Sequence, residues 1–130
     1  MKLQPDRFDT LAITGHGPGW IAVNGEPVHH SLVVSAAGQQ QDWGCARLED
    51  LTEAHFERLL ALRPELVIFG SGPRLRFVRP ALLRPLIGQN IGVETMDTHA
   101  ACRTYNILAG EGRRVVAALL VEAGDAEGNG

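Results

Sequence analysis

Two groups of polar residues lie just beyond short apolar segments, where they could bind a small anion. One group follows residues 66–69 and the other follows residues 91–94. The candidate ligand-binding residues are Gly70, Ser71, Gly72, Arg74, Asp97, Thr98, His99 and Cys102. A glycine turn and a helix start both offer free backbone N–H groups, which favour a carboxylate or a phosphate. The alternative is structural: the glycines make a tight turn, and Asp97 or Thr98 caps a helix.

Cys102 could also be a nucleophile. It follows His99 by three residues, so the two side chains would share one face of a helix, near the end that stabilises a thiolate. Cys102 also lies on an apolar stripe with Tyr105, which favours a buried structural cysteine. Ser71 lacks the Gly-x-Ser-x-Gly setting of a hydrolase nucleophile. We therefore predict no catalytic residue, and whether the protein is an enzyme stays open, with a non-enzyme favoured.

Other residues argue against a metal, a cofactor or a nucleic acid. His29 and His30 are adjacent, so on a strand they would point to opposite faces and could not share a metal with His16. No motif calls for a cofactor. The arginines of residues 74–84 are interpreted as a solvated face, because the segment offers no series of stacking aromatic residues.

The elements that must position these candidates can be predicted. Residues 66–69 and 91–94 are typical of strands, and 98–109 of a helix capped by Asp97 or Thr98. The helix between Pro80 and Gly88 should be short or kinked, because Pro85 removes a hydrogen bond. If the two strands are parallel, their carboxyl ends meet at one rim and place the candidates side by side.

The rest of the chain predicts a sheet with flanking helices. Asn24-Gly25 indicates a β-hairpin, and strands are expected at 10–14, 31–35 and 115–121. Residues 36–42 are expected to be a polar loop. A helix is expected over 51–62, capped by Thr52 and ended by Pro64. The fold class is α/β: a single domain with a central mixed β-sheet, flanking helices and an N-terminal hairpin region.

Bulk properties limit the function classes. The chain has 130 residues, a net charge of −3 and 45% hydrophobic residues. We expect one domain over residues 1–121 and a disordered tail over 122–130. Nucleic-acid binding and membrane insertion are not expected. With two cysteines and no secretory signal, a cytoplasmic location is expected.

The C-terminal half resembles a known family. The segments concerned are 67–72 (VIFGSG), 92–98 (GVETMDT), 100–108 (AACRTYNIL) and 111–115 (EGRRV). They are similar to the Mth938 domain family, a domain of unknown function whose relatives include a mitochondrial complex I assembly factor. The resemblance implies a compact α/β domain with a mixed sheet, and it supplies no catalytic residues.

Two hypotheses follow. The favoured one is a non-enzymatic binding or assembly module, with a protein partner or self-association through an exposed apolar patch or a sheet edge. Trp20, Trp43 and the arm at Pro27 are the places where such a surface is expected. The alternative is a small-molecule or anion site, with or without enzymatic activity, at residues 70–73 and 97–102.

Overall fold

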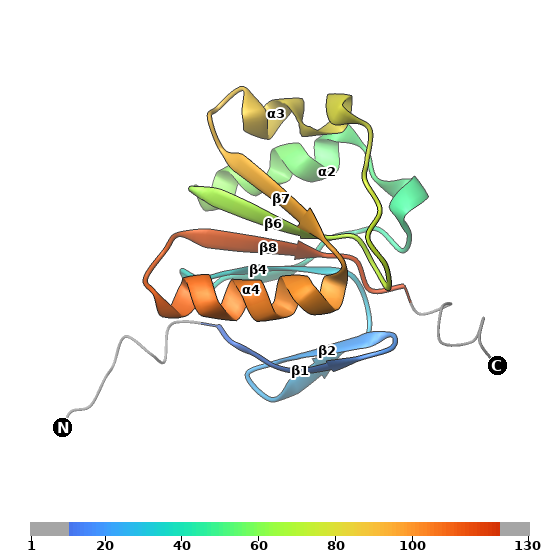
Figure 1. The fold of residues 1–130 in the computed structure, drawn as a ribbon, viewed down its shortest axis with the longest axis vertical. Helices are drawn as coiled ribbons and strands as arrows, with labels where there is room; N and C mark the ends of the chain where they lie inside the picture. The colour runs from blue at the N-terminus through green and yellow to red at the C-terminus, as the bar shows by residue number, and fades with distance from the viewer. Residues whose placement is uncertain (1–10, 123–130) are drawn as a thin grey trace.

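The computed structural model describes residues 11–122. Their strands form two sheets, and helices pack against the larger one (Figure 1). The strands are β1 Ile13–Gly17, β2 Trp20–Val23, β3 Glu26–Val28, β4 Leu32–Ser35, β5 Gln40–Asp42, β6 Leu66–Gly70, β7 Gly92–Met96 and β8 Val115–Leu119. The α-helices are α2 Glu53–Glu57, α3 Arg84–Ile87 and α4 Thr98–Gly110, and the 3-10 helices are η1 Leu48–Asp50, η2 Arg58–Leu62 and η3 Pro80–Leu83. Apart from Glu122, the predicted disordered tail lies outside the described residues.

The central sheet is mixed, as predicted. Its strand order is β5-β4-β8-β6-β7. β6 runs parallel to both β7 and β8, whereas β4 runs antiparallel to β8 and to β5. The parallel β6–β7 pair confirms the arrangement on which the candidate site depends. β7 and β5 form the two edges of this sheet.

The second sheet is the antiparallel set β1-β2-β3, which packs on the α4 side of the central sheet (Figure 1). Asn24 and Gly25 have φ values of +49° and +88°, the left-handed conformations that their type of hairpin turn needs. The predicted hairpin is therefore confirmed. Pro27 lies on the outer strand β3, where its missing N–H group breaks no internal pairing.

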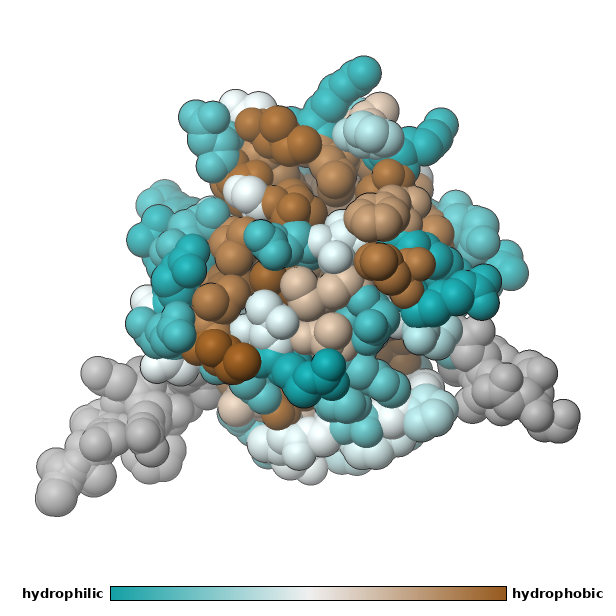
Figure 2. Space-filling model, viewed as in Figure 1, coloured by the Kyte–Doolittle hydropathy of each residue, from teal (hydrophilic) through white to brown (hydrophobic). Residues whose placement is uncertain are grey.

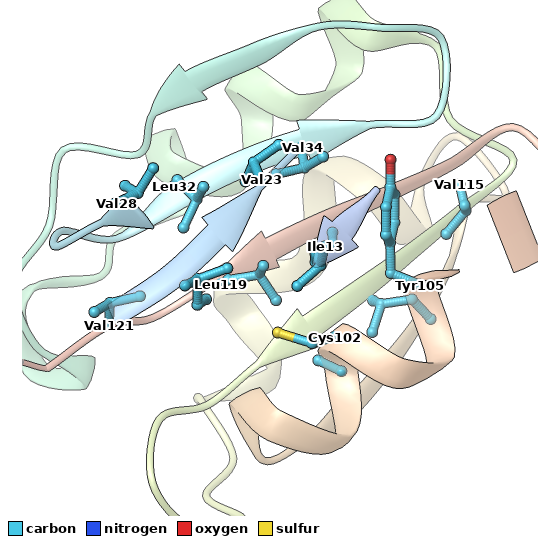
Figure 3. Packing of buried hydrophobic residues seen from close by; sticks show 14 residues of the cluster. Ile13, Val23, Val28, Leu32, Val34, Cys102, Tyr105, Val115, Leu119 and Val121 are labelled. Carbon is cyan, nitrogen blue, oxygen red and sulfur yellow. The ribbon is translucent and has the colours of Figure 1, made fainter. Parts of the chain in front are cut away.

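Helix α4 attaches the small sheet to the central one. Asn106 donates through Nδ2 to the Ile13 carbonyl (2.7 Å) and accepts through Oδ1 from the Ile13 N–H (2.9 Å), so it mimics a neighbouring strand. The Tyr105 hydroxyl donates to the Leu11 carbonyl (2.7 Å). The buried side chains of this layer include Ala101 and Cys102, which face the strands as the predicted apolar stripe requires (Figure 3).

The opposite face of the central sheet packs against α2 and α3, with Leu86 of α3 and a group of aromatic side chains in the core between them. Trp43, Phe56 and Phe69 are fully buried and meet edge to face, with ring centroids 5.5–5.9 Å apart. The expectation that Trp43 contributes to an exposed surface is therefore wrong. Its indole N–H donates to the His55 carbonyl (3.1 Å), which satisfies the polar group and lets the ring occupy the core.

Several local boundaries differ from the sequence prediction; β8, for example, ends at Leu119 and not at residue 121. β1 begins at Ile13 and extends to Gly17, three residues beyond the predicted end of the strand, because the chain turns only at Pro18-Gly19. Residues 40–42, expected in a loop, form β5 because they pair with β4. The helix expected over 51–62 is α-helical only to Glu57 and then continues as a 3-10 helix.

The helix cap at Thr52 and the prolines at positions 80 and 85 behave as expected. Thr52 is the N-cap of α2, and Pro80 lies in the first turn of η3. Pro85 lies in the first turn of α3, where its missing N–H is tolerated, so the segment divides into two short helices. Gly88 ends α3.

Candidate functional site

The two candidate segments lie side by side at one rim of the central sheet. Gly70 of β6 pairs with Met96 of β7, and the chain leaves both strands at this level. The Ser71 N–H donates to the Met96 carbonyl, and the Thr98 N–H donates to the Gly72 carbonyl, each at 2.8 Å. The predicted juxtaposition is confirmed.

Thr98 joins three segments through a single hydroxyl. Its Oγ1 accepts from the Gly72 N–H and donates to the Leu120 carbonyl, each at 2.8 Å, and the residue is 5% exposed. Gly70 is required beside it, because a Cβ there would lie 3.0 Å from Thr98 Oγ1 and 3.1 Å from Thr98 Cα. These polar groups therefore bond to one another and hold the three segments together.

Ser71 is also used internally. It is fully buried; its Oγ donates to the Arg74 carbonyl (2.9 Å) and accepts from the Arg76 N–H (3.0 Å). Asp97 is the N-cap of α4, with Oδ1 accepting from the Ala100 N–H at 2.9 Å. The structural interpretation of both residues therefore accounts for their contacts.

Arg76 and Glu122 form an ion pair that sequence reasoning missed. Arg76 Nη2 lies 2.7 Å from Glu122 Oε2, and the same guanidinium donates to the Ser71 carbonyl through Nη2 (2.7 Å) and Nε (3.1 Å). Glu122 also accepts from the Leu48 N–H at 2.9 Å. The two side chains are only 20% and 8% exposed. No local signal could reveal the pair, because 46 residues separate them.

His99 stacks on His16, which reaches it from β1. The ring centroids are 4.4 Å apart, with 30° between the planes. Within residues 11–122, His16 Nδ1 is buried without a hydrogen-bond partner. Burial lowers the pKa of His16, and the charges of His99 and Arg103 lower it further, while Asp97 opposes them. The stack therefore favours a neutral His16 ring.

Cys102 is 1% exposed on the inner face of α4. Burial raises the pKa of its thiol to about 12, with the nearby Arg103 opposing that effect. The thiol is therefore protonated at neutral pH, and among the described residues no hydrogen bond joins it to His99. Its surroundings are those of a structural cysteine.

A small cleft of about 140 Å³ opens at this rim. Its residues are Gly17, Pro18, Gly19, Trp20, Ile21, Gly72, Pro73, Thr98, His99, Leu120, Val121 and Glu122. The candidates Gly72, Thr98 and His99 therefore line it, whereas the other five candidates do not. The wall from the β1–β2 turn was missed by sequence reasoning. A signal existed there: Gly15 and Gly17 alternate on β1 and leave room for the Trp20 ring.

Comparison with known proteins decides the family. A family model described as "Protein of unknown function (DUF498/DUF598)" matches residues 13–120. The chain belongs to this family. A solution structure from Bordetella pertussis, described as a Mth938-like domain, has the same fold as this chain, with a TM-score of 0.80 and 33% sequence identity. The match covers 94% of this chain and 93% of that chain. The resemblance stated from the sequence is confirmed.

Other relatives of this family member are similar along most of its length. A crystal structure from Bordetella parapertussis superposes with a TM-score of 0.82 at 39% identity, covering 87% of this chain and 97% of that chain. The NADH dehydrogenase (ubiquinone) 1 alpha subcomplex assembly factor 3 of Bos taurus is 38% identical over 124 residues. That match covers 94% of this chain and about two thirds (67%) of the bovine protein. Within residues 11–122, every helix is too short or too polar to cross a bilayer.

Proposed function

We propose that this protein is a non-enzymatic binding module that acts in the assembly of a protein complex. The observation that carries the proposal is a set of large apolar side chains more than half exposed to solvent: Leu75 and Phe77 before α3, and Ile87 at the end of α3. Apolar side chains gathered on a surface mark interaction sites more often than single exposed ones do. The polar residues at the sheet rim, by contrast, already bond to one another.

The relatives support the same proposal. The bovine relative is named an assembly factor, and the match covers nearly all of this chain. Fold alone does not carry function from one protein to another, so the partner of that relative is not transferred here. What supports the proposal for this chain is the combination of a similar sequence and its own exposed apolar surface.

Capture and sedimentation experiments test this proposal. The full chain with an affinity tag should recover a defined protein from a lysate of the source organism, or it should sediment as a dimer or higher oligomer. Either result follows if the exposed apolar surface is covered in solution. A strictly monomeric protein that repeatedly recovers no partner would contradict the proposal.

A second candidate function is the binding of a small anion, with Gly70, Ser71, Gly72, Arg74, Asp97, Thr98, His99 and Cys102 as its proposed residues. One observation favours it: the cleft at the rim, into which His99 and the start of α4 contribute. Titration with inorganic phosphate should then show saturable binding that His99→Ala weakens. His16→Ala is the matched control, since it breaks the same ring stack without changing the cleft lining. Equal losses in both variants, or no binding of phosphate, would contradict this candidate.

A cytoplasmic location is part of the proposal. Both cysteines, Cys45 and Cys102, are free thiols, which is the usual state in a reducing compartment. Fractionation of cells that express the protein with a tag would test it, and recovery outside the cytoplasm would contradict it.

A further inference from the structure

Positive charge is concentrated in one part of an otherwise acidic chain. Residues 66–93 contain four arginines and no acidic residue, so the rest of the chain holds the other eight basic residues and all fifteen acidic ones. Arg76 forms an ion pair with Glu122, as described above. The other three, Arg74, Arg79 and Arg84, are exposed, and none of them forms an ion pair with a residue in the range 11–122.

These three arginines lie in the same part of the chain as three of the exposed large apolar side chains of residues 11–122. Leu75, Phe77 and Ile87 are 53%, 70% and 57% exposed. Figure 2 shows hydrophobic residues gathered over α3 and the segment that leads to it, with hydrophilic residues around them. We call the six residues Arg74, Leu75, Phe77, Arg79, Arg84 and Ile87 the arginine-rimmed patch.

The backbone holds this patch in a fixed form. Along residues 75–79, which lie outside the helices and strands, exposure alternates: Leu75, Phe77 and Arg79 are exposed, whereas Arg76 and Val78 are partly buried. Arg76 and Val78 point inward, where Arg76 binds the Ser71 carbonyl and Val78 packs on the core, and Leu75 and Phe77 therefore point outward. Pro80 begins η3 directly after this segment. A surface held in this way loses little conformational entropy when a partner binds.

We propose that the arginine-rimmed patch binds a segment of a partner protein in which apolar side chains are flanked by aspartate or glutamate. Burial of Leu75, Phe77 and Ile87 against the partner would remove their apolar surface from water. The guanidinium groups of Arg74, Arg79 and Arg84 would form bidentate hydrogen bonds with carboxylates of the partner. The inference rests on the proposed function and adds the chemistry of the partner.

Charge argues against two other occupants. A second copy of this chain, packed through the same patch about a two-fold axis, would place arginines against arginines. A single-stranded nucleic acid needs several stacking platforms, and the patch offers one exposed aromatic ring, that of Phe77. An acidic and apolar protein segment satisfies both features of the surface.

Capture of the partner by the full tagged chain, from nuclease-treated lysate, tests the inference. The triple variant Arg74→Glu/Arg79→Glu/Arg84→Glu should reduce recovery of the partner at least tenfold, and the neutral triple variant to Gln should reduce it less. Phe77→Ser should also reduce it at least tenfold. Rising salt should weaken capture by the wild-type protein, because the ion pairs lie at the rim.

The matched control lies on α4. Arg103→Glu/Ile107→Ser makes one charge reversal and one apolar-to-polar change at two exposed residues of that helix, and it should leave recovery unchanged. A photoreactive benzoylphenylalanine in place of Phe77 should cross-link to a partner segment that contains both apolar and acidic residues. Circular dichroism checks that each variant remains folded.

The outcomes separate the inference from the function on which it rests. If a partner is captured equally by the wild-type chain and the Arg→Glu variant, the binding module stands and the inference is wrong. It is also wrong if the cross-linked segment is basic, if it comes from a second copy of this chain, or if nuclease abolishes capture. If the wild-type chain captures nothing and is monomeric, the proposed function itself fails.

Discussion

The segment between β6 and η3 carries three arginines, and two of them, Arg74 and Arg76, have opposite surroundings although they are only two residues apart. Arg76 points inward, binds the Ser71 carbonyl and pairs with Glu122, whose side chain is 8% exposed. Arg74 lies on the outer side and has no ion pair within the described chain. Residue type and position in the sequence are nearly the same, so the difference comes from the partners that each side chain meets: Arg76 reaches Ser71 and Glu122, whereas Arg74 is exposed to water.

The rim of the central sheet, where β6 and β7 end, differs from the arginine-rimmed patch in the same way. At the rim, Ser71, Gly72 and Thr98 form hydrogen bonds with one another and with the backbone, so their polar groups hold the fold together. In the patch, apolar side chains and guanidinium groups are left to water. Polar residues beyond strand ends are therefore not evidence of a ligand site until their partners are known, and unused groups are the better guide to binding.

The largest effect is expected from removing Arg76. Arg76→Ala should reduce the free energy of unfolding by about 3 kcal/mol, because it leaves Glu122 mostly buried and without its counter-ion. Arg74→Ala should change it by less than about 0.5 kcal/mol, as expected for an exposed side chain with no partner. Urea unfolding of the two variants measures the difference, and equal effects would remove the contrast drawn above.

A smaller loss is expected at Thr98. Thr98→Val keeps the shape but leaves the Gly72 N–H and the Leu120 carbonyl without their partner, which should cost about 2 kcal/mol. Thr98→Ser retains the hydroxyl and should cost less than about 1 kcal/mol. Chemical unfolding again provides the measurement. A Val variant as stable as the Ser variant would show that the rim hydrogen bonds contribute little.

The His16–His99 stack predicts a pH dependence. The pKa of His16 is lowered in the native state, so the unfolded chain binds more protons there. The stabilising contribution is present above the unfolded value of 6.5 and is lost as the pH falls through the lowered native pKa. His16→Phe keeps a stacking ring without a titrating group, so its stability should fall less between pH 7 and pH 5. Parallel pH profiles of the two proteins would contradict this assignment.

No measurable reaction is expected at Cys102 in the native protein. Its pKa is raised to about 12 by burial, so the thiolate is scarce at pH 8. In a Cys45→Ser background, iodoacetamide should label Cys102 only after unfolding, as followed by mass spectrometry. Rapid labelling of the native protein would instead show that Cys102 is a reactive thiol, and the contrast between the sheet rim and the arginine-rimmed patch would be wrong.

Signals that act over a few residues predicted local structure well. Asn24-Gly25 gave the hairpin, Asp97 gave the cap of α4, and Pro85 gave a short helix. Each works through backbone conformation or a hydrogen bond between near neighbours. The parallel pair β6–β7 was also predictable, because its two apolar segments are separated by a helical one.

Features that depend on distant partners were not predictable in this way. Trp43 was expected at a surface, but its ring packs between Phe56 and Phe69 in the core. Residues 40–42 look like a loop and become β5 because β4 is available to pair with them. Of the candidate site residues, only Gly72, Thr98 and His99 line the cleft, whose other wall comes from the β1–β2 turn.

The amino-acid order by itself determined the mixed sheet and the meeting of two strand ends at one rim, because hydrophobic periodicity and turn residues act locally. The family was indicated by the resemblance of segments 67–72, 92–98, 100–108 and 111–115 to known members. Only the tertiary structure decided which polar groups there remain free. Thr98 meets the Leu120 carbonyl and Arg76 meets Glu122 across many intervening residues. Most buried polar groups in a folded protein have a hydrogen-bond partner, and here those partners come from distant parts of the chain, whereas Arg74 and Phe77 remain exposed to water.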